Sequence, residues 1–200
     1  MKSFFPVLQH VNPPNLITTL GLVFGVAASY YLVGGSLRLT LVCLFFAMFM
    51  DVLDGFLAGK LNCKSRFGQS MDSMVDFFIC CVMPVWMVLT FVGNSALLVG
   101  GLVFYCACGL WRLAHFNVMA SENPGNLAYF TGLPVPGAMM LASASIWLVV
   151  YHALPIWLLA AALFLAGVLM VSRFKLKKYG MAQKALWVAG AAFLAIVVAS

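Results

Sequence analysis

Long apolar stretches, separated by short segments that carry glycine, proline and charge, follow one another along the whole chain. A helix needs about 20 predominantly apolar residues to cross the hydrocarbon core of a bilayer, and most of these stretches approach that length. Hydropathy and the breaks between stretches predict seven membrane spans. Their approximate ranges are 15–33, 37–58, 69–92, 95–117, 133–152, 155–171 and 183–199. The pattern predicts an all-α, polytopic membrane bundle with about six or seven transmembrane helices, in one domain over residues 1–200.

The first twelve residues mix apolar and polar positions and precede Pro13. An interfacial amphipathic helix and an unstructured tail both fit this segment, and both stay open. The first apolar stretch begins after Asn15 and shows no small-residue cleavage pattern before Gly34. We therefore interpret it as a retained helix rather than a removed signal peptide.

Composition and charge add an orientation to this picture. The chain is 64% hydrophobic and 8% charged, with a net charge of +6. With the N-terminus in the cytoplasm, every basic residue except Arg38 falls at an inner end of a span, which is a strong positive-inside bias. The expected location is a bacterial or archaeal inner (cell) membrane. The basic segment 173–184 is interpreted as attraction to anionic membrane lipids. No nucleic acid partner is expected, because the basic residues are few and lie against the membrane.

Four of the five acidic residues, Asp51, Asp54, Asp72 and Asp76, gather in one short part of the chain. A carboxylate in hydrocarbon costs several kcal/mol unless it is paired, hydrated or metal-bound. The spacings i, i+3 and i, i+4 place each pair on one helix face, and antiparallel packing of the second and third spans would bring the pairs together. Four hard oxygen donors suit Mg²⁺ or Mn²⁺ and can hold two ions. We therefore predict a cation site open to the cytoplasm.

Small and basic residues accompany these acids. Gly55 and Gly68 leave room for a phosphate or nucleotide to approach the backbone. Lys60, Lys64 and Arg66 lie between the two acidic pairs and are expected to bind an anionic group of a substrate. This set favours metal-bridged phosphoryl transfer, in which a spare carboxylate accepts the proton of the nucleophile. For any single aspartate, a role in helix pairing or capping remains an alternative.

The acidic segment resembles the signature of the CDP-alcohol phosphotransferases, Asp-x2-Asp-Gly-x2-Ala-Arg-x8-Gly-x3-Asp-x3-Asp. Seven of its eight fixed positions match, and they are Asp51, Asp54, Gly55, Ala58, Gly68, Asp72 and Asp76. The start of the first span, 14–18, is also similar to the family. The segments 112–117, 129–136 and 169–172 are similar to its phosphatidylserine synthase branch.

The resemblance implies a helical membrane enzyme, usually a homodimer, that attacks CDP-diacylglycerol with the serine hydroxyl and releases CMP. Asp51, Asp54 and Asp72 would ligate two ions, and Asp76 would be a further ligand and the general base. The residues expected to bind CDP are Gly55, Ala58, Gly68, Lys60 and Arg66. The residues expected to contact the acceptor or a phosphate are Arg112, His115, Asn117, Tyr129, Thr131 and Gly132. A second reading of 133–136 is simply the start of the fifth helix, since proline is tolerated there.

Two positions depart from the family pattern. Gly59 stands where the signature has arginine, and His115 stands where the serine branch has its second arginine. Each change removes a bidentate cation. Three alternatives therefore stay open: the same chemistry with another alcohol (inositol phosphate, glycerol phosphate or choline), a divalent-cation transporter, and a relative that binds the lipid nucleotide without turning it over.

Overall fold

The computed structural model describes residues 9–122, 129–177 and 181–199, without the side chains of 129–130, 175–177 and 181–187. Helices account for nearly all of this part of the chain, which confirms the predicted all-α bundle. Their bounds are α1 Pro13–Val33, α2 Leu37–Lys60, α3 Arg66–Phe77, the π-helical turn η2 Phe78–Val82, α4 Met83–Phe91, α5 Ala96–Glu122, α6 Val135–His152, α7 Ile156–Val171 and α8 Met181–Ala199.

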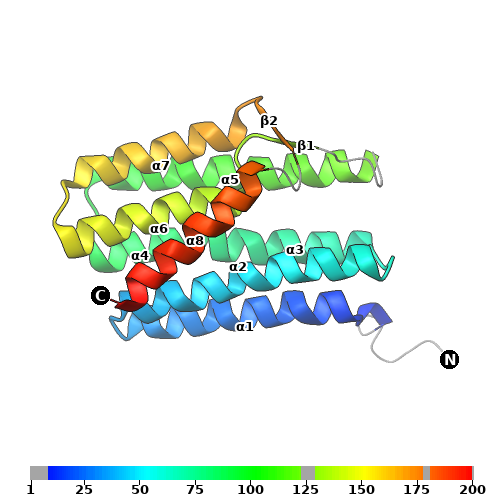
Figure 1. Cartoon of the computed structure of the whole chain (residues 1–200). Coiled ribbons are helices and arrows are strands. Elements are labelled where there is room, and N and C mark those ends of the chain that lie inside the picture. The colour runs from blue at the N-terminus through cyan, green and yellow to red at the C-terminus, as the bar shows by residue number, and fades with distance from the viewer. Residues whose placement is uncertain (1–8, 123–128, 178–180, 200) are drawn as a thin grey trace.

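The helices match the predicted spans within a few residues. α3, η2 and α4 form one continuous helical run, so the predicted third span is a single element with a change of geometry inside it. Within the described residues, five helical runs are long and apolar enough to cross a membrane, and α7 and the 188–199 part of α8 are shorter apolar helices. Most helices lie side by side, whereas α8 crosses the bundle obliquely (Figure 1). Residues 1–8 of the possible interfacial helix lie outside the described residues.

Side-chain caps set the helix starts that matter for the site. The Asn12 side chain accepts a hydrogen bond from the Asn15 backbone N–H at 2.9 Å, ahead of two prolines in the first turn of α1. The Ser65 hydroxyl accepts one from the Gly68 N–H at 3.0 Å at the start of α3. Such caps satisfy N–H groups that have no partner within the helix. The turn 61–65 between α2 and α3 is short, which places these two helices antiparallel.

Two short strands were not predicted. β1 (Tyr129–Thr131) pairs antiparallel with β2 (Lys175–Lys177), and together they link the segments that follow α5 and α7. Each strand has only three residues, too few for an alternating pattern to be read in the sequence.

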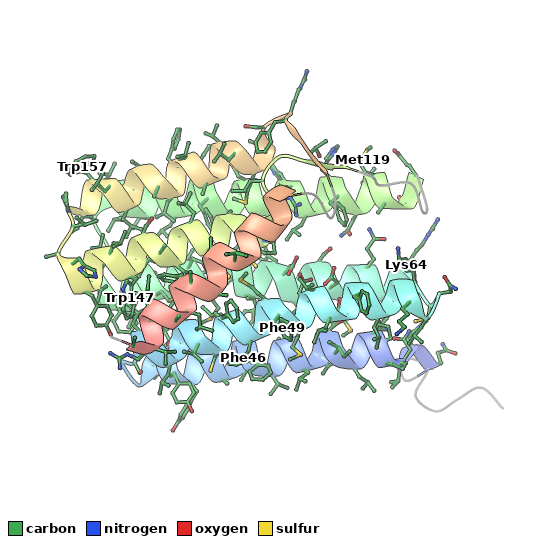
Figure 2. All side chains as sticks on the ribbon, in the orientation of Figure 1. Phe46, Phe49, Lys64, Met119, Trp147 and Trp157 are labelled. Carbon is green, nitrogen blue, oxygen red and sulfur yellow. The ribbon has the colours of Figure 1, made fainter. Side chains whose placement is uncertain are left out.

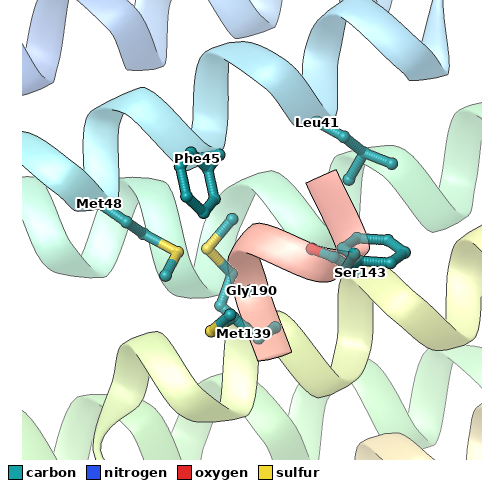
Figure 3. A pocket seen from close by; sticks show the side chains of 8 residues that line it. Leu41, Phe45, Met48, Met139, Ser143 and Gly190 are labelled. Atoms are coloured by element: carbon teal, nitrogen blue, oxygen red, sulfur yellow. The ribbon is translucent and has the colours of Figure 1, made fainter. Parts of the chain in front are cut away.

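A small, mainly apolar pocket lies between α2, α6 and α8 (Figure 3). The buried Ser143 hydroxyl lines it and has no hydrogen-bond partner among the described residues. The other lining residues are Leu41, Phe45, Met48, Met139, Met140, Gly190 and Phe193.

Candidate metal and substrate site

Three of the four clustered aspartates meet between α2 and α3. Carboxylate oxygens of Asp51, Asp72 and Asp76 all lie within 4.8 Å of one another, and the three residues are half-buried. Asp72 and Asp76 come from successive turns of α3, and the short turn 61–65 folds α3 back against the end of α2 that carries Asp51. Three carboxylates this close repel one another unless a cation or proton lies between them. Hard oxygen donors at this spacing fit Mg²⁺ or Mn²⁺.

Asp54 is buried and is not part of this three-carboxylate group. Its carboxylate accepts a hydrogen bond from the hydroxyl of Thr18 on α1. The same hydroxyl also lies 3.1 Å from the Pro14 carbonyl oxygen, one helical turn earlier. The first helix therefore fixes the orientation of Asp54, a contact that the sequence pattern did not indicate.

Arg112 on α5 adds a positive charge to the site. Its side chain is buried, with 9% of its surface exposed. Its charge interacts with those of Asp76 and Asp51, and its guanidinium carbon lies 5.8 Å from the centre of the Phe116 ring. A buried arginine near Asp76 and Asp51 lowers the net negative charge of the site without occupying a metal ligand position.

Asn117, one and a half turns after Arg112, links α5 to α3. Its side-chain oxygen accepts hydrogen bonds from the Gln69 amide at 3.1 Å and from the Ser73 hydroxyl at 3.0 Å. Gln69 and Ser73 each precede an aspartate of α3 by three residues and therefore share its face. We did not predict these two residues, although the helical period alone would have indicated them. His115, two residues before Asn117, is exposed.

The two glycines beside the acids have different surroundings. A Cβ atom at Gly55 would meet nothing within 4 Å, so this position is open. A Cβ atom at Gly68 would lie 2.7 Å from the Asn15 side-chain oxygen. Asn15 is itself buried and donates from its amide to the His10 carbonyl oxygen at 2.8 Å. Gly68 therefore allows α1 and α3 to approach closely, whereas Gly55 leaves free space next to Asp54.

A lysine side chain lies next to Gly59, the position where the signature has arginine. A Cβ atom built at Gly59 has the Lys64 side chain as its neighbour, with the lysine Cε at 3.9 Å. Figure 2 shows Lys64 at the end of the bundle where α2 turns into α3. Lys60 and Arg66 are exposed at the same turn, and Ala58 is half-buried. Lys64, one of the three basic residues expected to bind an anionic group, therefore lies next to Gly59.

Gly132 packs against the end of α7. It has a φ of +71°, and a Cβ atom there would overlap the Met170 carbonyl oxygen. Its N–H donates to the Phe174 carbonyl oxygen at 2.8 Å. Glycine is needed here for backbone conformation and close approach. Thr131 is exposed in β1, and the side chain of Tyr129 lies outside the described residues.

The chain is similar in sequence to known proteins over most of its length. The sequence model of the family described as CDP-alcohol phosphatidyltransferase matches residues 11–168. That range includes every aspartate of the site, Arg112 and Asn117.

Three similar proteins carry names that include serine. A CDP-diacylglycerol–serine O-phosphatidyltransferase of Methanocaldococcus jannaschii is 27% identical over 175 residues, covering 88% of this chain and 78% of the relative. One from Helicobacter pylori is 30% identical over 177 residues, covering 82% and 73%. An archaetidylserine synthase of Methanothermobacter thermautotrophicus is 31% identical over 144 residues, covering 69% and 59%.

Proposed function

The chain belongs to the CDP-alcohol phosphatidyltransferase family, and we propose that it transfers a phosphatidyl group from CDP-diacylglycerol to the hydroxyl of serine and releases CMP. The family assignment makes it a membrane enzyme of phospholipid synthesis. The observation that carries the mechanism is the meeting of Asp51, Asp72 and Asp76 within 4.8 Å at the end of α2 and the start of the third span.

The carboxylates supply the ligands that the reaction requires. Asp51, Asp72 and Asp76 would hold Mg²⁺ or Mn²⁺, and Asp54, whose carboxylate accepts a hydrogen bond from Thr18, would be an additional ligand one turn further along α2. Two ions are expected for four carboxylates. Bound divalent cations neutralise diphosphate oxygens and so make CMP a better leaving group.

Asp76 is the proposed general base. The serine hydroxyl oxygen forms a bond to the phosphorus that carries diacylglycerol, the bond from this phosphorus to the CMP oxygen breaks, and the hydroxyl proton passes to an Asp76 carboxylate oxygen. Arg112 balances the charge of Asp76 and Asp51 from α5. Arg112 stays charged throughout the reaction. Its positive charge therefore still compensates the remaining carboxylate when Asp76 has accepted the proton.

The nucleotide is proposed to lie over the open face of α2 beside Gly55 and Ala58. Nothing lies within 4 Å of a Cβ atom placed at Gly55, which leaves room for a phosphate to approach the backbone. Lys60 and Arg66, with Lys64 beside the Gly59 position, would contact the phosphates. Lysine provides a point charge where the family arginine provides a fork, so phosphate binding here is expected to be less directional.

The relatives' names support serine as the acceptor. The names given above share serine, whereas the lipid part is phosphatidyl in two of them and archaetidyl in the third. The acceptor therefore has wider support than the exact lipid. Asn117 is the acceptor contact that we favour, because its oxygen accepts from Gln69 and Ser73 and its side-chain N–H groups could then donate to a carboxylate.

The protein is proposed to lie in the membrane with its N-terminus and its site on the cytoplasmic side. The turn that carries Lys60, Lys64 and Arg66 lies at the same end of the bundle as the start of α1 (Figure 1). Basic loops at one end support a cytoplasmic N-terminus and a cytoplasmic site. We also propose a homodimer, which mass measurement in detergent would test.

The test is CMP release by the purified protein. CDP-diacylglycerol and Mn²⁺ or Mg²⁺ are supplied with serine, inositol phosphate, glycerol phosphate or choline in separate reactions. Release with serine alone is the expected result. Release with a different alcohol would mean that this alcohol, and not serine, is the acceptor, while the transfer chemistry would stand. Absence of CMP with every alcohol, together with divalent-cation uptake into liposomes, would refute the enzyme and favour a transporter.

A further inference from the structure

The helical run that carries Asp72 and Asp76 changes geometry just beyond them. Residues Phe78–Val82 form a π-helical turn, and the Met83 N–H donates to the carbonyl oxygen of Phe78, five residues earlier. A π-turn inserts one residue into an α-helix, and such turns often occur at functional sites. The turn begins two residues after Asp76, so it lies directly between the acidic α3 and the apolar α4.

Pro84 removes a backbone hydrogen-bond donor at this turn. Proline has no N–H to give, so residue 84 supplies no donor to the carbonyls one turn earlier. These are Ile79 in the five-residue pattern of the turn and Cys80 in the regular four-residue pattern, and both residues are buried. Buried carbonyls are normally hydrogen-bonded, so a donor from another helix stabilises the turn.

Tyr105 on α5 supplies that donor. Its side chain is fully buried, and its hydroxyl donates to the Cys80 carbonyl oxygen at 2.8 Å. The next residue of α5, Cys106, directs its thiol to the Cys81 carbonyl oxygen at 3.4 Å. Two consecutive carbonyls of the π-turn are thus held by two consecutive residues of α5, and the tyrosine hydroxyl is the stronger donor.

We propose that Tyr105 is a positioning residue for the aspartate site. By donating the hydrogen bond that Pro84 cannot make, Tyr105 holds the π-turn. The π-turn in turn sets how far α3 is rotated about its axis and shifted along it. This position of α3 makes Asp72 and Asp76 face Asp51. Cys80 lies one turn beyond Asp76, so a change at its carbonyl reaches the aspartates through continuous helix. Only the activity readout rests on the proposed function. Mn²⁺ affinity rests on the proposed aspartate site but not on the transfer reaction, and backbone protection rests on neither.

The experiment compares the whole chain with four variants in one detergent, one of which is Pro84→Ala alone. Tyr105→Phe keeps the ring and removes the donor. Tyr105→Phe combined with Pro84→Ala restores an N–H at position 84. Tyr30→Phe is the matched control, because Tyr30 is 76% exposed. The measurements are Mn²⁺ affinity by electron paramagnetic resonance, kcat and KM for CMP release, and hydrogen exchange of peptides from the region 76–91.

In Tyr105→Phe we expect Mn²⁺ affinity to fall by about fivefold or more, the change that a loss of about 1 kcal/mol in aspartate positioning produces. Exchange should rise in the π-turn, and kcat should fall with little change in KM for the lipid nucleotide. The double variant should recover most of each loss, and Tyr30→Phe should match the wild type. A purely structural role would lower thermal stability but leave the Mn²⁺ affinity and kcat of the folded Tyr105→Phe protein unchanged.

Three results would overturn the proposal. The first is a Tyr105→Phe protein whose Mn²⁺ affinity stays within about twofold of wild type, a negligible free-energy change, with unchanged exchange. The second is a double variant as impaired as the single one. If Tyr105→Phe does not fold, folding of the double variant supports the proposal, and failure of both while Pro84→Ala alone folds overturns it. A wild type that releases no CMP refutes the proposed function, and the affinity and exchange comparisons then still decide the role of Tyr105.

Discussion

Replacing Gly55 and Gly68 by alanine, one at a time, separates nucleotide binding from helix packing. Both glycines match the family signature, and both were expected to line the CDP pocket. The structure gives them opposite surroundings: open space at Gly55, and the Asn15 side-chain oxygen 2.7 Å from an added Cβ at Gly68. The same chemical change, one methyl group, should therefore have different consequences at the two positions.

The magnitudes follow from these surroundings. Gly55 lies inside α2, where alanine is preferred to glycine by up to about 1 kcal/mol, so Gly55→Ala should leave stability unchanged or raise it. At Gly68 the methyl group must displace Asn15, whose amide is bonded to the His10 carbonyl. Losing that bond or accepting the overlap costs about 1–3 kcal/mol. For a chain of this size each kcal/mol corresponds to a melting shift of about 2–4 °C.

The assay is thermal unfolding in detergent, paired with KM for CDP-diacylglycerol measured well below both transitions. We expect Gly68→Ala to melt several degrees lower, and Gly55→Ala to melt at or above the wild type with a raised KM. The reasoning is refuted if Gly55→Ala loses as much stability as Gly68→Ala. It also fails at Gly68 if that variant melts like the wild type.

Further predictions concern individual side chains. Asp76→Asn should abolish CMP release while lipid-nucleotide binding stays measurable, and Asp51→Asn should instead weaken Mn²⁺ binding; near-normal turnover of Asp76→Asn would disprove the assigned base. Chelation with EDTA should stop CMP release and re-addition of Mn²⁺ should restore it, whereas activity that persists after exhaustive chelation would contradict the metal requirement. Thr18→Val removes the hydrogen bond to Asp54 and should lower metal affinity severalfold in a calorimetric titration, since a hydrogen bond to a charged group is worth about 1.5–3 kcal/mol. Ser143→Ala removes a buried hydroxyl that has no partner among the described residues, so its melting temperature should equal or exceed that of the wild type.

The helices could be predicted because their signals are local. Apolar length defines the spans, and Asn12 with Pro13 and Ser65 mark the starts of α1 and α3. The meeting of Asp51 with Asp72 and Asp76 followed from spacing and a short turn. Each of these inferences needs only the residues of one helix or of two neighbours joined by a few residues.

Other features depend on partners far away in the sequence and could not be predicted in this way. Asp54 is hydrogen-bonded to Thr18, 36 residues earlier, and is not part of the group formed by the other three acids. The π-turn leaves hydropathy unchanged, so the only sequence sign of it was Pro84 within an apolar span. Gly132 had been grouped with acceptor contacts by resemblance, and its packing on α7 becomes visible only when the two segments are seen together.

The helix that carries the site has both apolar and polar contacts. α3 contains no fully buried residue, although Val75 and Phe77 pack against the core, so apolar burial contributes less to its position than it does for the neighbouring helices. Polar side chains add to it: Asn15 close to Gly68 at its start, Asn117 with its two hydrogen bonds in its middle, and Tyr105 bonded to Cys80 just beyond its end. α1 and α5 supply all of these partners. Hydrogen bonds are directional, so they set the rotation of a helix more narrowly than apolar contacts do. Changes in α1 and α5 that remove these donors and acceptors should therefore alter metal affinity more than apolar changes of equal size in the core.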